Sequence, residues 1–185
     1  SSGPHDGVNN VIARPIYLPA LDVSGGSTID PASSIVVEQE IAPGEMAAVT
    51  VAAGSLESQT GEMFTGTLSI TEVPRDLTPA ALPPSLLLDT VVTIQPGEMV
   101  FTQPAPLTLP NRAGYVPGTE TNLWSIDPVS GEFVIVGTGR VSDDGSVIET
   151  VEGGIRNSSW HGMEPIIGTD QRTGLRCYGH HIFGS

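Results

Sequence analysis

The stretch that decides the fold is TGTLSITEV, residues Thr65–Val73, in which apolar and polar side chains alternate. In an extended strand Leu68 and Ile70 would lie on one face, and the threonine and serine side chains between them on the other. Apolar side chains gathered on one face are typical of a strand that packs one side against a core. We therefore predict a core β-strand at this position.

Short β-branched runs separated by Pro, Gly, Asn and Asp extend outward from this strand in both directions, and helical periodicity is almost absent. This pattern is typical of an all-β chain. We predict an antiparallel β-sandwich, followed by a β-meander and an irregular C-terminal tail. The prolines of residues 74–88 predict a crossover between sheets, with at most one helical turn at 78–82. Further strands are predicted at residues 10–18, 35–40, 47–52, 90–95, 107–109, 122–126, 132–137, 139–141 and 146–151.

The same pattern divides the chain into four parts. Residues 1–34 are expected to form an N-terminal linker or edge strand at the end of an upstream domain. Residues 35–110 form the sandwich, and residues 111–162 a meander that packs on it or continues it. Trp160 and His161 are expected to close the last regular strand, so that residues 163–185 are a tail or linker.

Composition excludes several kinds of function. The 185 residues include 21 acidic side chains and seven basic ones, all arginine, for a net charge of −14. Without lysine, Schiff-base chemistry and lysine-dependent crosslinks are excluded. The negative charge argues against nucleic acid and anionic membranes as partners, because both repel an acidic surface. No run of 18 apolar residues is present, so membrane insertion is not expected.

Two predicted turns carry clustered acidic residues, Asp127 and Glu132 at the first and Asp143 and Asp144 at the second. Calcium prefers carboxylate oxygens, so each turn is a candidate Ca²⁺ site and Ca²⁺ is the one candidate cofactor. Neither turn matches an EF-hand loop. An aspartate can equally accept hydrogen bonds from the backbone of its own turn, with no metal present. Both interpretations stay open at the sequence level.

Histidine and cysteine gather near the C-terminus. Cys177 and His180 are three residues apart, His181 follows directly, and His161 could fold back to join them as ligands of a transition metal. Zinc sites usually bring two ligand pairs together, whereas here the spacing supplies one. The alternative is a tail with incidental histidines.

Two segments, in the expected order, resemble a known module. VTVAAGSL, residues 49–56, is similar to the strand and glycine turn of ZU5 domains, and TIQPGEMVFTQPAPLTLP, residues 93–110, to the proline-bounded block of that family. The segment 122–151 resembles the strand meander that follows ZU5-like units in large bacterial surface proteins. The resemblance covers roughly residues 35–161 and implies a spacer or protein-interaction module.

Some ZU5-type units cleave themselves at a His-Phe-Ser site, which needs a strained peptide bond, a serine hydroxyl and a base. The matching strand end here has the sequence IRNSSWH, residues 155–161, and lacks His-Phe-Ser. The candidate residues for self-cleavage are Ser158 and Ser159 with His161, or Ser185 in the terminal HHIFGS.

Aromatic residues suggest one further function. Tyr115 and Trp124 could stack on a sugar ring if both were exposed, whereas Trp124 alternates with apolar neighbours as a core residue does. A non-enzymatic structural, adhesion or spacer module of a large extracellular or cell-surface protein is thus the leading expectation. The alternatives are a self-processing module and a carbohydrate- or peptide-binding sandwich. Expected partners are neighbouring domains of the same chain, other surface proteins or glycans.

Overall fold

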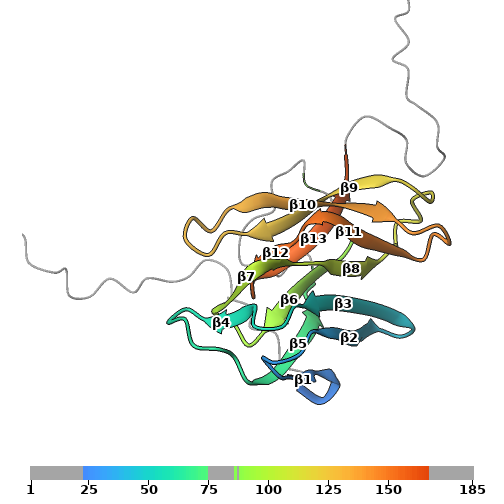
Figure 1. The fold of residues 1–185 in the computed structure, drawn as a ribbon. Coiled ribbons are helices and arrows are strands. Elements are labelled where there is room, and N and C mark those ends of the chain that lie inside the picture. Colours follow the sequence, from blue (N-terminus) through green and yellow to red (C-terminus); the bar gives the residue numbers. More distant parts are fainter. Residues whose placement is uncertain (1–22, 75–85, 87, 167–185) are drawn as a thin grey trace, which may run out of the picture.

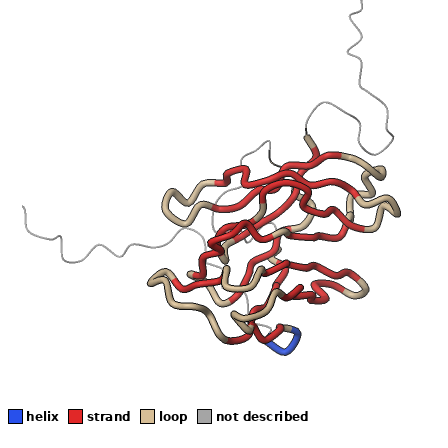
Figure 2. Tube along the Cα trace, viewed as in Figure 1, coloured by secondary structure: helices blue, strands red, loops and turns tan. Residues whose placement is uncertain are grey.

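The computed structural model describes residues 23–74, 86 and 88–166. Within these ranges the chain is all-β, and every strand pairing is antiparallel, which confirms the predicted class. Figure 2 shows strands throughout, with one short 3-10 helix, η1 (Val23–Gly25). The strand predicted at residues 10–18, the helical turn at 78–82 and the C-terminal tail beyond residue 166 lie outside the described residues.

Two sheets of unequal size make up the described fold (Figure 1). The small sheet has three strands in the order β12 (Ile155–Asn157), β7 (Met99–Ala105) and β4 (Leu56–Ser58). The main sheet has ten, in the order β1 (Ser27–Ile29), β5 (Gly66–Glu72), β6 (Val91–Gln95), β13 (Trp160–Pro165), β9 (Glu120–Ile126), β10 (Phe133–Val141), β11 (Val147–Gly153), β8 (Leu107–Pro110), β3 (Glu45–Val51) and β2 (Ile35–Ala42).

The main sheet nearly closes into a barrel, because its last strand, β2, comes back to β5. A side chain bridges this seam: the Ile70 amide of β5 donates a hydrogen bond of 2.8 Å to Oε1 of Gln39 in β2. Gln39 is only 4% exposed. A buried amide group needs a partner, and here the glutamine side chain takes the place of a backbone carbonyl. A side-chain hydrogen bond therefore joins the two sides of the seam, where no backbone pairing between β2 and β5 is formed.

One apolar core fills the space inside the curved main sheet. It joins Val37, Val49, Leu68 and other main-sheet residues to Leu56, Phe101 and further side chains of the small sheet. The small sheet thus packs on the inner face of the main sheet. Phe101 of the small sheet is 1% exposed, which places its ring inside this core.

A second apolar cluster lies on the outer face of the main sheet. Trp124 alternates with Leu123 of the inner core along β9, and it packs with Val73, Leu86 and Leu88. A Cβ atom on Gly162 of β13 would lie 2.9 Å from the Leu88 side chain, so this glycine makes room for the covering residue.

The segment between β5 and β6 was expected to cross between sheets. That prediction is wrong, because β5 and β6 are hydrogen-bonded neighbours in the main sheet. The described parts of the segment, around Leu86 and Leu88, cover the outer face of the same sheet instead.

The clearest departure from the predicted boundaries is β13. The regular structure was expected to end at Trp160 and His161, with a tail from residue 163. Instead Trp160 begins a strand that runs to Pro165 between β6 and β9, in the interior of the main sheet. Two predicted strands, 132–137 and 139–141, form the single bulged strand β10.

Candidate functional site

The serine and histidine residues proposed for self-cleavage lie together where β12 passes into β13. Ser158 is 8% exposed. Its Oγ accepts a hydrogen bond of 2.8 Å from the Met99 amide, and its own amide donates to the Met99 carbonyl at 3.0 Å. The Ser158 side chain therefore holds this connection to the first residue of β7. Ser185, the other proposed nucleophile, lies outside the described residues.

His161 is completely buried. Its Nε2 lies 3.1 Å from the Asn157 carbonyl oxygen and 3.3 Å from the Ser159 amide nitrogen, while Nδ1 has no hydrogen-bond partner among the described residues. Burial lowers the pKa of His161 to about 3, although the contact with Asn157 acts in the opposite direction. The ring is therefore neutral near pH 7.

The arrangement of these groups differs from that of an activated nucleophile. A catalytic base accepts a proton from the nucleophile through a direct hydrogen bond. Within the described residues, no hydrogen bond joins the His161 ring to the hydroxyl of Ser158 or Ser159. His161 instead contacts the backbone of its own turn, at the Asn157 carbonyl oxygen and the Ser159 amide. The other proposed metal ligands, Cys177, His180 and His181, lie outside the described residues.

The first acidic turn binds its own backbone. Oδ1 of Asp127 accepts hydrogen bonds from the amides of Val129 and Ser130, at 2.9 and 2.8 Å. These two bonds, the one from Ser130 foremost, lower the pKa of Asp127. Glu132 is exposed at the end of the same turn.

The second acidic turn does the same through Asp144. Its Oδ1 accepts hydrogen bonds from the Ser142 hydroxyl at 2.6 Å and from the amide and hydroxyl of Ser146 at 2.9 and 2.7 Å. The Ser142 hydroxyl is the largest of the causes that lower the pKa of Asp144 to about 2. Asp143 is exposed beside it.

The two turns lie at opposite ends of β10, so their four carboxylates do not form one site. The part of the chain that the structure describes contains no group of three or more His, Cys, Asp or Glu side chains placed to hold a metal ion. Calcium binding at either turn stays a prediction.

Tyr115 and Trp124 face different surroundings. Tyr115 packs against the inner core, and its hydroxyl donates a hydrogen bond of 2.8 Å to Oδ2 of Asp89. Trp124 packs in the outer cluster, and its Nε1 is buried without a partner among the described residues. The two rings do not form a common platform for a sugar, because each packs against a separate cluster.

Comparisons with known proteins found no similar protein. No family model, no curated protein and no solved structure matches this chain. The described ranges contain no helix of the length and apolarity that crossing a membrane requires.

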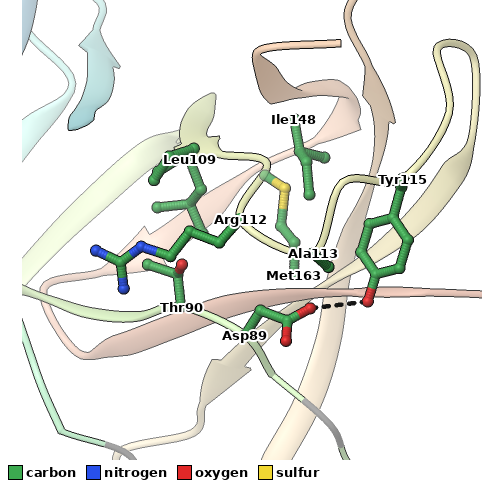
Figure 3. A pocket seen from close by; sticks show the side chains of 9 residues that line it. Asp89, Thr90, Leu109, Arg112, Ala113, Tyr115, Ile148 and Met163 are labelled. Atoms are coloured by element: carbon green, nitrogen blue, oxygen red, sulfur yellow. Dashed lines mark hydrogen bonds between the residues drawn. The ribbon is translucent and has the colours of Figure 1, made fainter. Parts of the chain in front are cut away.

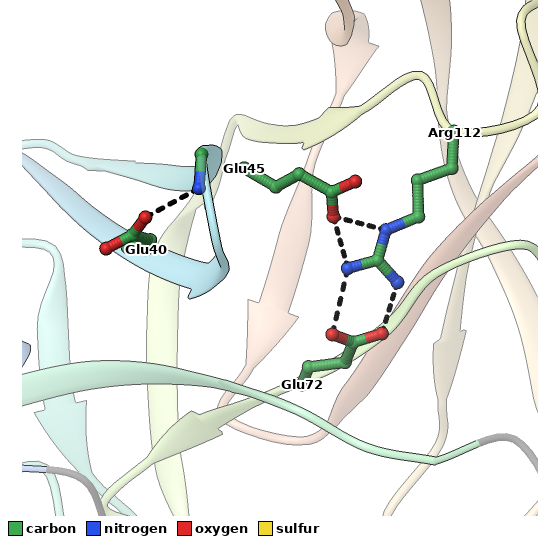
Figure 4. Close-up of polar contacts among 5 residues, drawn as sticks. Glu40, Glu45, Glu72 and Arg112 are labelled. Atoms are coloured by element: carbon green, nitrogen blue, oxygen red, sulfur yellow. Dashed lines mark hydrogen bonds and ion pairs between the residues drawn. The ribbon is translucent and has the colours of Figure 1, made fainter.

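A polar cluster that sequence reasoning missed lies near the barrel seam (Figure 4). Arg112, just after β8, forms ion pairs with Glu45 of β3 and Glu72 of β5. The Glu72 carboxylate, and to a smaller extent that of Glu45, raises the pKa of Arg112 beyond its usual range. Burial of the guanidinium lowers this pKa, but by less than the two carboxylates raise it. Arg112 therefore links three segments on the two sides of the seam.

Two hollows adjoin Arg112. One is a cavity of about 10 Å³ lined by Asp89, Thr90 and Tyr115, among others (Figure 3). The other is an open groove of about 290 Å³ that runs from Met46 to Val147. Ligand pockets usually enclose about 300–1,000 Å³ and bury most of the ligand. The cavity is far below that size.

Proposed function

We propose that this chain is a non-enzymatic structural module, a spacer or adhesion unit, of a larger extracellular or cell-surface protein. The observation that carries the proposal is the path of the chain. The described part begins beside β1 at the bottom of the molecule and leaves β13 beside the start of β9 at the top (Figure 1), where the Ile166 amide donates to the Glu120 carbonyl. A module entered on one side and left on the other can extend a chain of domains.

The filled interior supports this proposal. The inner core joins both sheets, and the polar side chains proposed for chemistry, Ser158, His161, Asp127 and Asp144, bond to backbone or side chains of the molecule itself. Such groups stabilise turns and strand ends. The contacts of these four side chains are therefore of the kind expected in a structural module.

The ZU5-like motifs give the finer form of the proposal. We infer a ZU5-type sandwich in which the main sheet is the larger layer and the small sheet the smaller one, since both contribute to one core as sandwich layers do. The proposed partners are the neighbouring domains of the same chain, other surface proteins and glycans. The acidic surface disfavours nucleic acid.

Pulling on single molecules tests the structural role. The protein, tethered at its two termini, should unfold in one cooperative event at a clear force peak, because a single inner core joins the main sheet to the small one. Extension without a force peak would contradict the role of a load-bearing spacer. If members of a glycan panel change the tryptophan fluorescence of the protein when they are added, that result would favour the carbohydrate-binding alternative.

Intact-mass measurement tests the absence of catalysis. After long incubation near neutral pH the purified protein should keep the mass of a single chain. The self-processing alternative has one observation in its favour, the grouping of Ser158, Ser159 and His161 at one connection. Two fragments whose masses sum to that of the whole chain plus one water molecule would support that alternative, because cleavage of a peptide bond takes up one water. Serine-to-alanine variants at 158 and 159 would then identify the nucleophile.

A further inference from the structure

The small cavity beside Arg112 is lined by residues of β8 and the loop after it, of β11 and β13, and of the segment that leads into β6 (Figure 3). Asp89 and Thr90 lead into β6, and Tyr115 lies on the loop between β8 and β9. The side chain of Met163, from β13, forms another part of the wall. The cavity volume of about 10 Å³ matches the smallest space that holds one water molecule.

One wall of this cavity carries the hydroxyl group of Thr90. Thr90 is 4% exposed, and its Oγ1 is buried with no hydrogen-bond partner among the described residues. A buried hydroxyl without a partner is unfavourable, and buried polar atoms are nearly always paired with protein or ordered water. We therefore expect the Thr90 hydroxyl to have a hydrogen-bond partner that is small enough to fit in the cavity.

The neighbouring carboxylate can complete such a site. Oδ2 of Asp89 accepts the hydrogen bond of Tyr115, which orients the carboxylate, and the group keeps further lone pairs for another donor. A ligand here must be as small as water, and must both donate to a carboxylate and bond a hydroxyl. A water molecule meets all three conditions.

We propose that this cavity binds one structural water molecule, which donates to the Asp89 carboxylate and bonds the Thr90 hydroxyl. Through the bond between Asp89 and Tyr115, this water joins the start of β6 to the loop that follows β8. The site is independent of the structural role proposed above, because it concerns how two connections are held together.

A high-resolution crystal structure tests the proposal directly. It should show one ordered water within hydrogen-bond distance of Thr90 Oγ1 and an Asp89 carboxylate oxygen. Thr90→Ser should keep that water, and Thr90→Val should lose it. Density without a water in the unaltered protein, or a Thr90 hydroxyl bonded to a protein carbonyl, would overturn the proposal.

Stability measurements give a second test, in which the direction of the change in the urea midpoint decides the outcome. Thr90→Val should lower the urea midpoint, because the water loses a partner, and Thr90→Ser should restore part of the loss. Thr121 is the matched control: it is fully buried, its Oγ1 has no partner among the described residues, and it does not line this cavity. Thr121→Val should leave the midpoint unchanged or raise it. A rise for Thr90→Val as well would mean that its hydroxyl has no water, and would overturn the proposal.

Discussion

At the scale of single residues, several of the most closely packed glycines lie where the chain leaves the main sheet for the small one. A Cβ atom on Gly154 would lie 2.6 Å from the Ala105 carbonyl oxygen, and one on Gly137 would lie 2.4 Å from the Glu152 carbonyl oxygen. Gly154 also has a φ of 147°, a conformation that other residues rarely adopt. Two backbones thus touch at a crossing that admits no side chain.

Substituting Gly154 by alanine should lower the free energy of unfolding by about 2 kcal/mol or more, because backbone atoms must move apart. Gly97 is the control, since a Cβ there meets nothing within 4 Å. Gly97→Ala should change stability by about 0.5 kcal/mol at most. Urea titration of both variants measures the difference, and equal midpoints would contradict the prediction.

The buried histidine should make stability depend on pH. The pKa of His161 is about 3 in the folded protein, against an ordinary value of 6.5. Below pH 6.5 the unfolded chain therefore binds a proton that the folded chain does not. The free energy of unfolding should fall by up to about 1.4 kcal/mol per pH unit between these two values as the pH decreases.

Comparison with His161→Gln isolates this effect from that of the carboxylates. Urea titrations at pH 7 and pH 5 should show a smaller loss of stability for the variant than for the unaltered protein. The variant is expected to be less stable at pH 7, so the decisive quantity is the change between the two pH values. An identical change in both proteins would rule out His161 as the source.

At the scale of elements, the sequence predicts strands where apolar residues alternate and misses those where they do not. The strand around Leu68 and Ile70 was found as β5, and both side chains are buried. The β13 sequence WHGMEP has no β-branched residue. Its buried positions include His161 and Glu164, although polar residues of these types usually indicate an exposed segment. Tertiary packing, rather than local pattern, makes β13 a strand.

The candidate sites divide in the same way. The turns at Asp127 and Asp144 follow from local sequence, because an aspartate bonds amides two or three residues away. The Arg112 cluster could not be predicted, since its partners lie 67 and 40 residues earlier in the chain. Its one sequence signal was a rare basic residue in an acidic chain.

Removing this arginine should weaken the barrel seam. Arg112→Met leaves the Glu45 and Glu72 carboxylates near each other without a cation, and we expect a loss of about 1 kcal/mol at low salt. Arg140→Met is the matched control, because its ion pair with Glu120 is longer, at 3.6 Å, and both side chains are more than half exposed. That variant should lose little.

Thermal or urea unfolding at low and high salt measures both variants. The loss for Arg112→Met should shrink as salt screens the two carboxylates. The double variant Arg112→Met with Glu72→Gln should recover part of it, because only one charge then remains. A cost for Arg112→Met no larger than for Arg140→Met would show that the cluster does not hold the seam.

At the scale of the whole molecule, charge is concentrated in the described fold. These ranges contain 17 of the 21 acidic residues and three of the seven arginines, so they alone carry the full excess of 14 negative charges. Self-repulsion of this kind opposes the compact state and is screened by salt. The fold must therefore be held by its core and its seam contacts against this repulsion.

Salt should consequently raise the melting temperature, and the effect should depend on ionic strength alone. CaCl₂ and MgCl₂ at equal ionic strength should raise it equally, since Asp127 and Asp144 already bond their own turns. Differential scanning calorimetry measures this. A further rise with Ca²⁺ that a chelator reverses would instead support the predicted calcium site.

The position of β13 determines when the chain can fold. This strand pairs with β6 on one side and β9 on the other, so it joins β1, β5 and β6 to the remaining strands of the described main sheet. During synthesis those two sets emerge first and have unpaired edges until Pro165 has left the ribosome. Folding that waits for such distant contacts is slow, and open edges can pair with other chains. The same strand that makes the finished sheet continuous thus leaves the nascent chain exposed to aggregation until β13 itself has been synthesised.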